Sequence, residues 1–247
     1  MEAAQKIRMA VAAVALLRQA GQANPALREA VGEVKRLQSQ RFAGTYTDLL
    51  AGGQHAAATR FFLDELYNDK DYAQRDAQFA RIAGAIEKFL PAHAADTAVG
   101  LAQLHALTEA LDQAMAVAWL APANAGLSPA QRYVAAWREV GRRADREAQL
   151  TGVMGIGQQL ARLTRKPGLR MMLRMMRGPA SAGGMSSLQR FLERGFDTFA
   201  AMAGQTQGTE EFLDTIGLRE SALIAMLFDR ELATCGTELQ RILGQAR

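Results

Sequence analysis

Cysteine, histidine and proline are all scarce in this chain of 247 residues, and each shortage excludes a class of protein. The one cysteine, Cys235, cannot form an internal disulfide, and a single thiolate cannot build a cysteine-based zinc site. With 3 histidines there is little material for a metal centre, and the paired Glu-x-x-His motifs of di-iron bundles are missing. Only 6 prolines beside 49% hydrophobic residues exclude a disordered chain. We therefore predict a folded protein without a metal site or a cofactor.

Long apolar runs are also missing. The longest one near the N-terminus covers residues 7–17, whereas a membrane-spanning helix needs about 20 apolar residues. Ala-x-Ala patterns do not identify a signal-peptide cleavage site here, because alanine is abundant throughout the chain. We therefore expect a cytoplasmic protein, a location that agrees with the single cysteine.

The residues that are abundant favour helices. Alanine, leucine, glutamine, arginine and methionine have high helix propensity, and apolar residues recur three and four positions apart without sustained alternation. The sequence therefore predicts an all-α fold, a single bundle of about nine to ten helices. Residues 1–247 are expected to form one domain, in which residues 1–24 make a loosely attached N-terminal helix.

Capping residues and glycines set the expected helix boundaries. Asn24 and Ser128 each precede a proline, which is typical of a helix start, and Ser186 is expected to begin a capping box. Glycines within 152–157 are expected to kink a long helix or to admit a crossing helix. The glycine-rich stretch 178–187 is expected to be a loop. The predicted helices cover residues 3–20, 25–51, 54–68, 71–90, 92–120, 129–165, 167–177, 187–203, 209–229 and 231–243.

The positive charge of the chain is concentrated in one segment. Residues 151–192 contain no aspartate or glutamate, and they include Arg162, Arg165, Lys166, Arg170, Arg174, Arg177 and Arg190. The remaining 22 basic residues are outnumbered by the 25 acidic ones. The surplus charge of +4 therefore belongs to this acid-free segment.

The predicted helix 167–177 carries part of this charge on one face. Arg170, Arg174 and Arg177 repeat at intervals of four and three, opposite an apolar face rich in methionine. Such a helix, with Arg190 nearby, can bind a partner protein or a second copy of the chain through adaptable methionines.

Four other interpretations of this region stay open. Anionic membranes and nucleic acids are less favoured partners, the latter because no aromatic residues are interleaved to stack on bases. The helix start near Ser186 can hold an anion on its amide groups. In the interpretation without a function, the helix belongs to the core and its arginines interact with the acidic stretch 61–76 or with solvent.

A second group of polar residues lies beside the apolar positions of that acidic stretch. Asp71 is expected to cap the following helix, while Arg75 and Asp76 flank its apolar stripe. With Tyr67, these residues are predicted to form a structural polar network rather than a metal cage.

A histidine and a glutamate share one face of the predicted helix 92–120. His105 and Glu109 are four positions apart, so we expect them to pair.

The pattern FF-x3-LY-x3-D-x3-RD runs from Phe61 to Asp76, within a longer matching stretch at 37–90. With MRGPA at 176–180 and LQRFLERGFDTF at 188–199, it resembles a family of bacterial all-α proteins that has no assigned activity, cofactor or catalytic residue. The resemblance implies a helical fold for most of the chain after residue 36, and it implies no site.

The favoured hypothesis is a non-enzymatic interaction or regulatory module that uses the basic, methionine-rich helix. The alternative is a small-molecule-binding protein or enzyme whose pocket lies between the predicted helices 54–90 and 92–120. Tyr67, Asp76 and His105 would supply the polar groups of that pocket.

Overall fold

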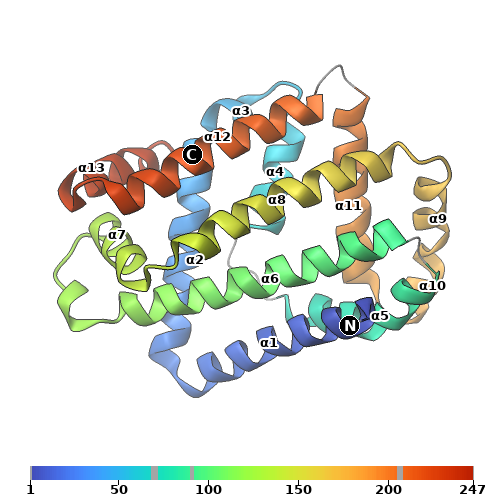
Figure 1. Ribbon diagram of the computed structural model, residues 1–247, viewed down its shortest axis with the longest axis horizontal. Coiled ribbons are helices and arrows are strands. Elements are labelled where there is room, and N and C mark those ends of the chain that lie inside the picture. Colours follow the sequence, from blue (N-terminus) through green and yellow to red (C-terminus); the bar gives the residue numbers. More distant parts are fainter. Residues whose placement is uncertain (1, 68–71, 90–91, 205–207, 247) are drawn as a thin grey trace. The chain divides into compact units, whose positions relative to one another are not determined.

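The computed structural model describes residues 2–67, 72–89, 92–204 and 208–246. Every regular element in these ranges is helical, which confirms the predicted all-α class (Figure 1). The elements are α1 (Ala3–Ala23), α2 (Pro25–Thr45), α3 (Thr47–Ala51), α4 (Ala56–Glu65), α5 (Ala73–Phe89), α6 (Ala92–Trp119), the 3-10 turn η1 (Pro122–Asn124), α7 (Pro129–Val140), α8 (Arg143–Thr164), α9 (Leu169–Met175), α10 (Arg177–Ala182), α11 (Ser186–Ala203), α12 (Gly208–Asp229) and α13 (Leu232–Leu243).

There are more helices than the nine or ten predicted, partly because two predicted helices are each divided in two. The predicted helix 25–51 becomes α2 and α3, which meet at the fully buried Tyr46. The predicted helix 129–165 becomes α7 and α8. Gly141 ends α7 with a φ of +62°, a left-handed conformation that glycine adopts without steric cost.

Two predicted helix starts are confirmed. The side chain of Asn24 accepts a hydrogen bond from the amide of Leu27 at 3.2 Å, and Pro25 follows it as the first residue of α2. Ser128 and Gln131 form a reciprocal capping box at the start of α7. Local signals of this kind are reliable because they satisfy amide groups that lack an intrahelical partner.

The predictions for 178–187 are wrong. Helix α10 occupies the first part of this stretch, and Pro179 lies in its first turn, where a missing amide hydrogen costs nothing. No side chain of its own caps α11 at Ser186. The amide of Leu188 donates instead to Oε1 of Gln78 at 2.9 Å, so a residue of α5 supplies the cap.

The chain divides into two compact units, and each has an apolar core. Unit 1 comprises residues 1–15, 70–106 and 152–213, and unit 2 comprises residues 16–69, 107–151 and 214–247. The organisation as one domain with a loosely attached helix over residues 1–24 stays a prediction.

The core of unit 1 is built from α1, α5, the first part of α6 and α11. Ile7 and Ala83 are fully buried in it. Helix α11 packs on α5, and α9 and α10 pack on α11. A Cβ atom on Gly157 would lie 2.6 Å from a methyl group of Leu213, so this glycine admits a side chain of α12, as predicted for the 152–157 glycines.

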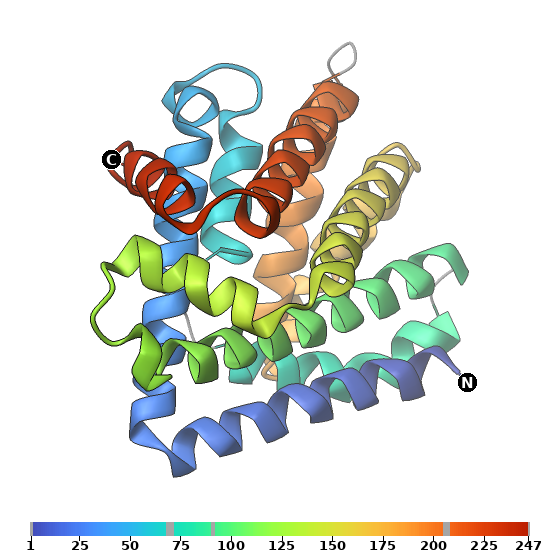
Figure 2. The same cartoon turned by 60° about the vertical axis from the view of Figure 1, so that its left-hand side comes forward.

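The core of unit 2 is built mainly from α2, α7, α12, α13 and the end of α6. Helix α13 crosses α2 at close range, as the red and blue ribbons in Figure 2 show. A Cβ atom on Gly44 would lie 1.9 Å from the carbonyl oxygen of Ile242, and one on Gly236 would lie 2.7 Å from Gln131 Cγ. Helix α13 therefore packs closely against α2 at Gly44 and against α7 at Gly236, because a glycine at each contact leaves the space that a side chain would fill.

Candidate functional site

The basic segment, which we define as residues 162–177, lies on the surface of unit 1. Its four methionines are all exposed, although methionine is usually buried. The exposed fractions are 61% for Met171, 39% for Met172, 71% for Met175 and 45% for Met176. The segment therefore presents an apolar patch to solvent instead of adding it to the core of unit 1.

Two of the predicted arginines pair with carboxylates of α11. Arg170 contacts Asp197 at 2.9 Å, and Arg177 binds both carboxylate oxygens of Glu193. The hydrogen bond from Arg177 holds the pKa of Glu193 below its usual value. These pairs lie at the surface, so the arginines of α9 and α10 are not part of the core.

The other cations of the acid-free segment stay without an ion pair among the described residues. All of them are exposed: Arg162, Arg165, Lys166, Arg174 and Arg190. Arg190 makes only a hydrogen bond to the hydroxyl of Ser187, at 3.4 Å. The surface around the four methionines therefore has a net positive charge.

Gln78 of α5 fixes the turn that leads from α10 into α11. Its side chain is 3% exposed, donates to the carbonyl of Gly184 at 2.8 Å and accepts from the amide of Leu188. Gly184 has a φ of +65°, which a residue with a Cβ rarely adopts. The amide of Leu188 at the start of α11 thus already donates to Gln78. It is not available to the anion that the sequence analysis considered at this helix start.

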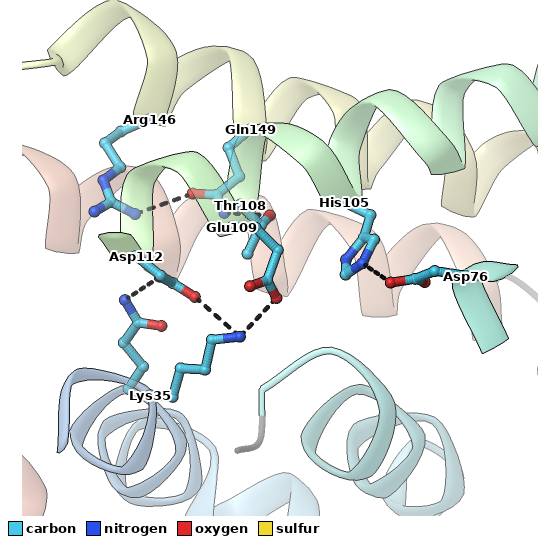
Figure 3. Close-up of polar contacts among 9 residues, drawn as sticks. Lys35, Asp76, His105, Thr108, Glu109, Asp112, Arg146 and Gln149 are labelled. Atoms are coloured by element: carbon cyan, nitrogen blue, oxygen red, sulfur yellow. Dashed lines mark hydrogen bonds and ion pairs between the residues drawn. The ribbon is translucent and has the colours of Figure 1, made fainter. Parts of the chain in front are cut away.

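The structure gives contacts for two residues of the predicted polar network, Asp76 and Arg75. Asp76, 4% exposed, hydrogen-bonds Nε2 of His105 at 3.0 Å (Figure 3). The guanidinium of Arg75 lies 3.6 Å from the ring centroid of Tyr72. Asp71 lies outside the described residues. Tyr67 belongs to unit 2, and Asp76 with His105 to unit 1.

An ion pair is buried in unit 2. Arg41 and Glu220 are 5% and 7% exposed, and their side chains meet at 2.5 Å. The hydroxyl of Tyr46 donates to the same carboxylate oxygen at 2.9 Å, and the ring of Tyr67 lies 5.4 Å from the guanidinium. Burial opposes the charge of Arg41, but the Glu220 carboxylate and the neighbouring tyrosine hydroxyls together outweigh burial and raise the pKa of Arg41. Burial also raises the pKa of Tyr46 and Tyr67.

A second polar group in unit 2 joins α2 to α6. Lys35 contacts Glu109 at 2.6 Å and Asp112 at 4.0 Å, and Gln38 donates to Asp112 at 3.0 Å (Figure 3). Glu109 thus pairs with Lys35, while His105 pairs with Asp76, so the predicted His105–Glu109 pair is wrong. Asp112 is 2% exposed, and burial raises its pKa.

Arg146 of α8 lies beside Asp112 in this part of unit 2 (Figure 3). It is 5% exposed, and within the described residues its side chain makes one hydrogen bond, to Oε1 of Gln149 at 3.4 Å. Gln149 in turn donates to Thr108 at 2.8 Å. The guanidinium lies 4.0 Å from the ring centroid of Trp137.

Sequence reasoning missed these buried charges, although one signal was available. Arg41 continues the apolar series Leu27, Ala30, Val34 and Leu37 at intervals of three and four, so it lies on the buried face of α2. Glu220 takes a similar place after Ile216 in α12. A charge in such a series indicates a buried partner, but it does not identify the partner.

Within the described residues, no three histidine, cysteine or acidic side chains gather as a metal site needs. The helices described include none that is long and apolar enough to cross a membrane. Cys235 is buried, and its thiol donates to the carbonyl of Met226 at 3.0 Å.

Comparison with known proteins gives a family and no activity. No curated protein and no solved structure matches the chain. The model of a family described as a domain of unknown function (DUF8198) matches residues 17–234. This agrees with the resemblance to a family without an assigned activity. The chain belongs to the family of this domain of unknown function, DUF8198.

Proposed function

We propose that the chain is a non-enzymatic interaction module that binds an acidic, amphipathic segment of a partner protein on its basic segment. The observation that carries the proposal is the row of four exposed methionines at Met171, Met172, Met175 and Met176. Methionine is flexible and polarisable, so an exposed methionine patch can adapt to the apolar face of a partner helix.

The charge around the patch supports an acidic partner. Arg165, Lys166 and Arg174 are exposed and form no ion pair at contact distance with a carboxylate of the described residues. A partner that carries carboxylates beside its apolar face would pair with these cations, and complementary charge speeds association and selects the partner. Arg170 of α9 and Arg177 of α10 pair with carboxylates of α11, and these ion pairs fix the two short helices on α11. The surface around the methionines still has a net positive charge.

Other partners of a basic surface fit less well. The segment has no aromatic side chain, so it lacks the platform on which single-stranded bases stack. A second copy of the chain and an anionic membrane remain outcomes of the test below.

The test measures binding of a labelled synthetic helical peptide with leucine on one face and glutamate on the other. An otherwise identical peptide has lysine in place of glutamate. We expect the acidic peptide to bind and the basic one to bind at least about tenfold more weakly. The double variants Arg165→Glu/Arg174→Glu and Met171→Ser/Met175→Ser should each weaken binding of the acidic peptide by about tenfold or more.

Matched controls exist in unit 2. Arg28 and Arg230 are exposed, as are Leu16 at 66% and Leu218 at 75%. Arg28→Glu/Arg230→Glu and Leu16→Ser/Leu218→Ser should leave peptide binding unchanged. Equal binding of both peptides contradicts the proposal. So does capture of duplex DNA, of phosphatidylglycerol vesicles or of a second copy of the chain, if the acidic peptide is not bound.

A further inference from the structure

Arg146 is a buried cation without a carboxylate partner. It is 5% exposed, and among the described residues no aspartate or glutamate oxygen lies within ion-pair distance of it. Its hydrogen bond to the neutral Gln149 is long, at 3.4 Å, and its Nη2 atom is buried without any acceptor. Buried charges in proteins are normally paired and hydrogen-bonded, because removing an ion from water is costly.

Arg41 in the same unit shows the normal arrangement. It is also 5% exposed, but Glu220 contacts it at 2.5 Å. The pKa values of the two guanidinium groups shift in opposite directions. The Glu220 carboxylate helps to raise the pKa of Arg41, whereas burial lowers the pKa of Arg146. Burial therefore destabilises the charged form of Arg146, and the charge of Asp112 offsets this effect only in part.

A second unpaired donor lies next to Arg146. The Trp137 ring stacks with its guanidinium at 4.0 Å, and Nε1 of this tryptophan is also buried without an acceptor. Buried indole N–H groups usually have a partner. Arg146 and Trp137 therefore place two neighbouring N–H groups without an acceptor in the same part of unit 2. An oxyanion can accept hydrogen bonds from two such donors.

Asp112 acts electrostatically on Arg146, but within the described residues it makes neither a hydrogen bond nor an ion pair with it. Asp112 accepts instead from Gln38 at 3.0 Å and lies 4.0 Å from Lys35, which also pairs with Glu109 (Figure 3). Burial raises the pKa of Asp112, which weakens it as a counter-ion for Arg146. Lys35 and Glu109 are each 14% exposed, so the polar group extends from the buried arginine to solvent.

We propose that unit 2 contains a binding site for a small oxyanion, a carboxylate or phosphate group, held by Arg146 Nη2 and Trp137 Nε1. Lys35 and Glu109 form the solvent-facing side of this site, where the rest of the ligand would contact polar groups. The site is independent of the basic segment, which belongs to unit 1.

The experiment titrates the full chain with inorganic phosphate and, separately, with succinate, at constant ionic strength set by sodium chloride. Tryptophan fluorescence and the melting temperature are both recorded. A ligand that binds only the folded chain raises its melting temperature in a saturable way. We expect phosphate or succinate to do so while chloride does not, and the anion that acts distinguishes a phosphate ligand from a carboxylate ligand.

Two variants assign the effect to the site. Arg146→Met should abolish the saturable shift, and Trp137→Phe, which keeps a smaller aromatic ring and removes the N–H, should weaken anion binding by about tenfold. Trp119→Phe is the matched control: Trp119 is 6% exposed and stacks on Arg132 at 4.5 Å, away from Arg146. It should leave the shift unchanged.

Ordered water is the competing occupant, because a water molecule also satisfies buried donors. In that case phosphate and succinate would act like chloride, and the proposal is wrong. It is equally wrong if the saturable shift persists in both Arg146→Met and Trp137→Phe. Because Trp137→Phe retains an aromatic ring at this position, it gives a second readout, so the test does not depend on whether the arginine variant folds.

Discussion

Arginines in the two units are used in opposite ways. In unit 1 the basic segment exposes its arginines, and the two that have carboxylate partners pair at the surface. In unit 2 Arg41 and Arg146 are both 5% exposed and lie among helices of the core. A surface arginine keeps its hydration and costs little, whereas a buried one depends on its neighbours. The contrast separates cations available to a partner from cations that need a counter-ion inside the fold.

The largest expected effect breaks the buried pair. Arg41→Met leaves the Glu220 carboxylate buried without its cation, so we expect a loss of about 3–5 kcal/mol in the free energy of unfolding. Arg146→Met leaves Asp112 with Gln38 and Lys35 as its partners, so it should cost less, about 1 kcal/mol. Urea denaturation of both variants measures the difference.

The double variant Arg41→Met/Glu220→Met serves as the control for the buried pair. It should recover much of the loss, because neither charge is then left alone. If Arg41→Met and Arg146→Met cost the same, the distinction between a paired and an unpaired buried arginine does not hold.

A smaller effect is expected where unit 1 holds its basic surface in place. Gln78→Leu removes the acceptor of the buried Leu188 amide and should cost about 1–3 kcal/mol. Gln74→Leu, in the same helix, is the control. Gln74 is exposed and accepts a hydrogen bond from the hydroxyl of Ser187 at 3.3 Å, so its replacement should lower the free energy of unfolding far less. Thermal and urea unfolding compare the two. Equal losses would show that the buried hydrogen bonds of Gln78 add nothing specific.

The pH dependence of stability should have opposite signs in the two units. Burial raises the pKa of Asp112, so its contribution to stability is full below its usual value of 3.8 and is lost as the pH rises through the raised pKa. Arg177 lowers the pKa of Glu193, so that contribution is full above the usual 4.5 and is lost as the pH falls through the lowered pKa. Urea midpoints across acid pH for Asp112→Asn and Glu193→Gln should therefore diverge from wild type in opposite directions.

The smallest expected effect concerns the exposed methionines. Met175 is 71% exposed, so Met175→Ser should change the free energy of unfolding by less than about 0.5 kcal/mol. A loss of 2 kcal/mol or more, on the order of a core substitution, would show that the patch supports the fold. Urea denaturation of this variant thus separates a surface kept for binding from one kept for stability.

Features determined by neighbouring residues were predictable from the sequence. The caps at Asn24 and Ser128 depend on residues within one helical turn, and the helix class follows from apolar spacing. Partners that are distant in sequence were not predictable. Glu220 is 179 residues from Arg41, and Gln78 is 110 residues from the amide it caps. Nothing in the local sequence of either residue identifies such a partner.

The candidate sites divide in the same way. The basic segment was visible as a stretch without acids, because charge composition is a local property. The environment of Arg146 was not visible, since the residue looks like any other arginine of a charged helix. Its significance depends on burial and on the missing acceptor, which only the packed structure gives.

The close seating of α13 gives a criterion for recognising remote relatives. At Gly44 and Gly236 the neighbouring helix occupies the space that a methyl group would need. A distant chain that keeps the helical pattern but has larger residues at both positions must carry its final helix further out. The residues aligned with Gly44 and Gly236 would then indicate whether a newly found member packs its final helix as closely as this chain does, before its structure is determined.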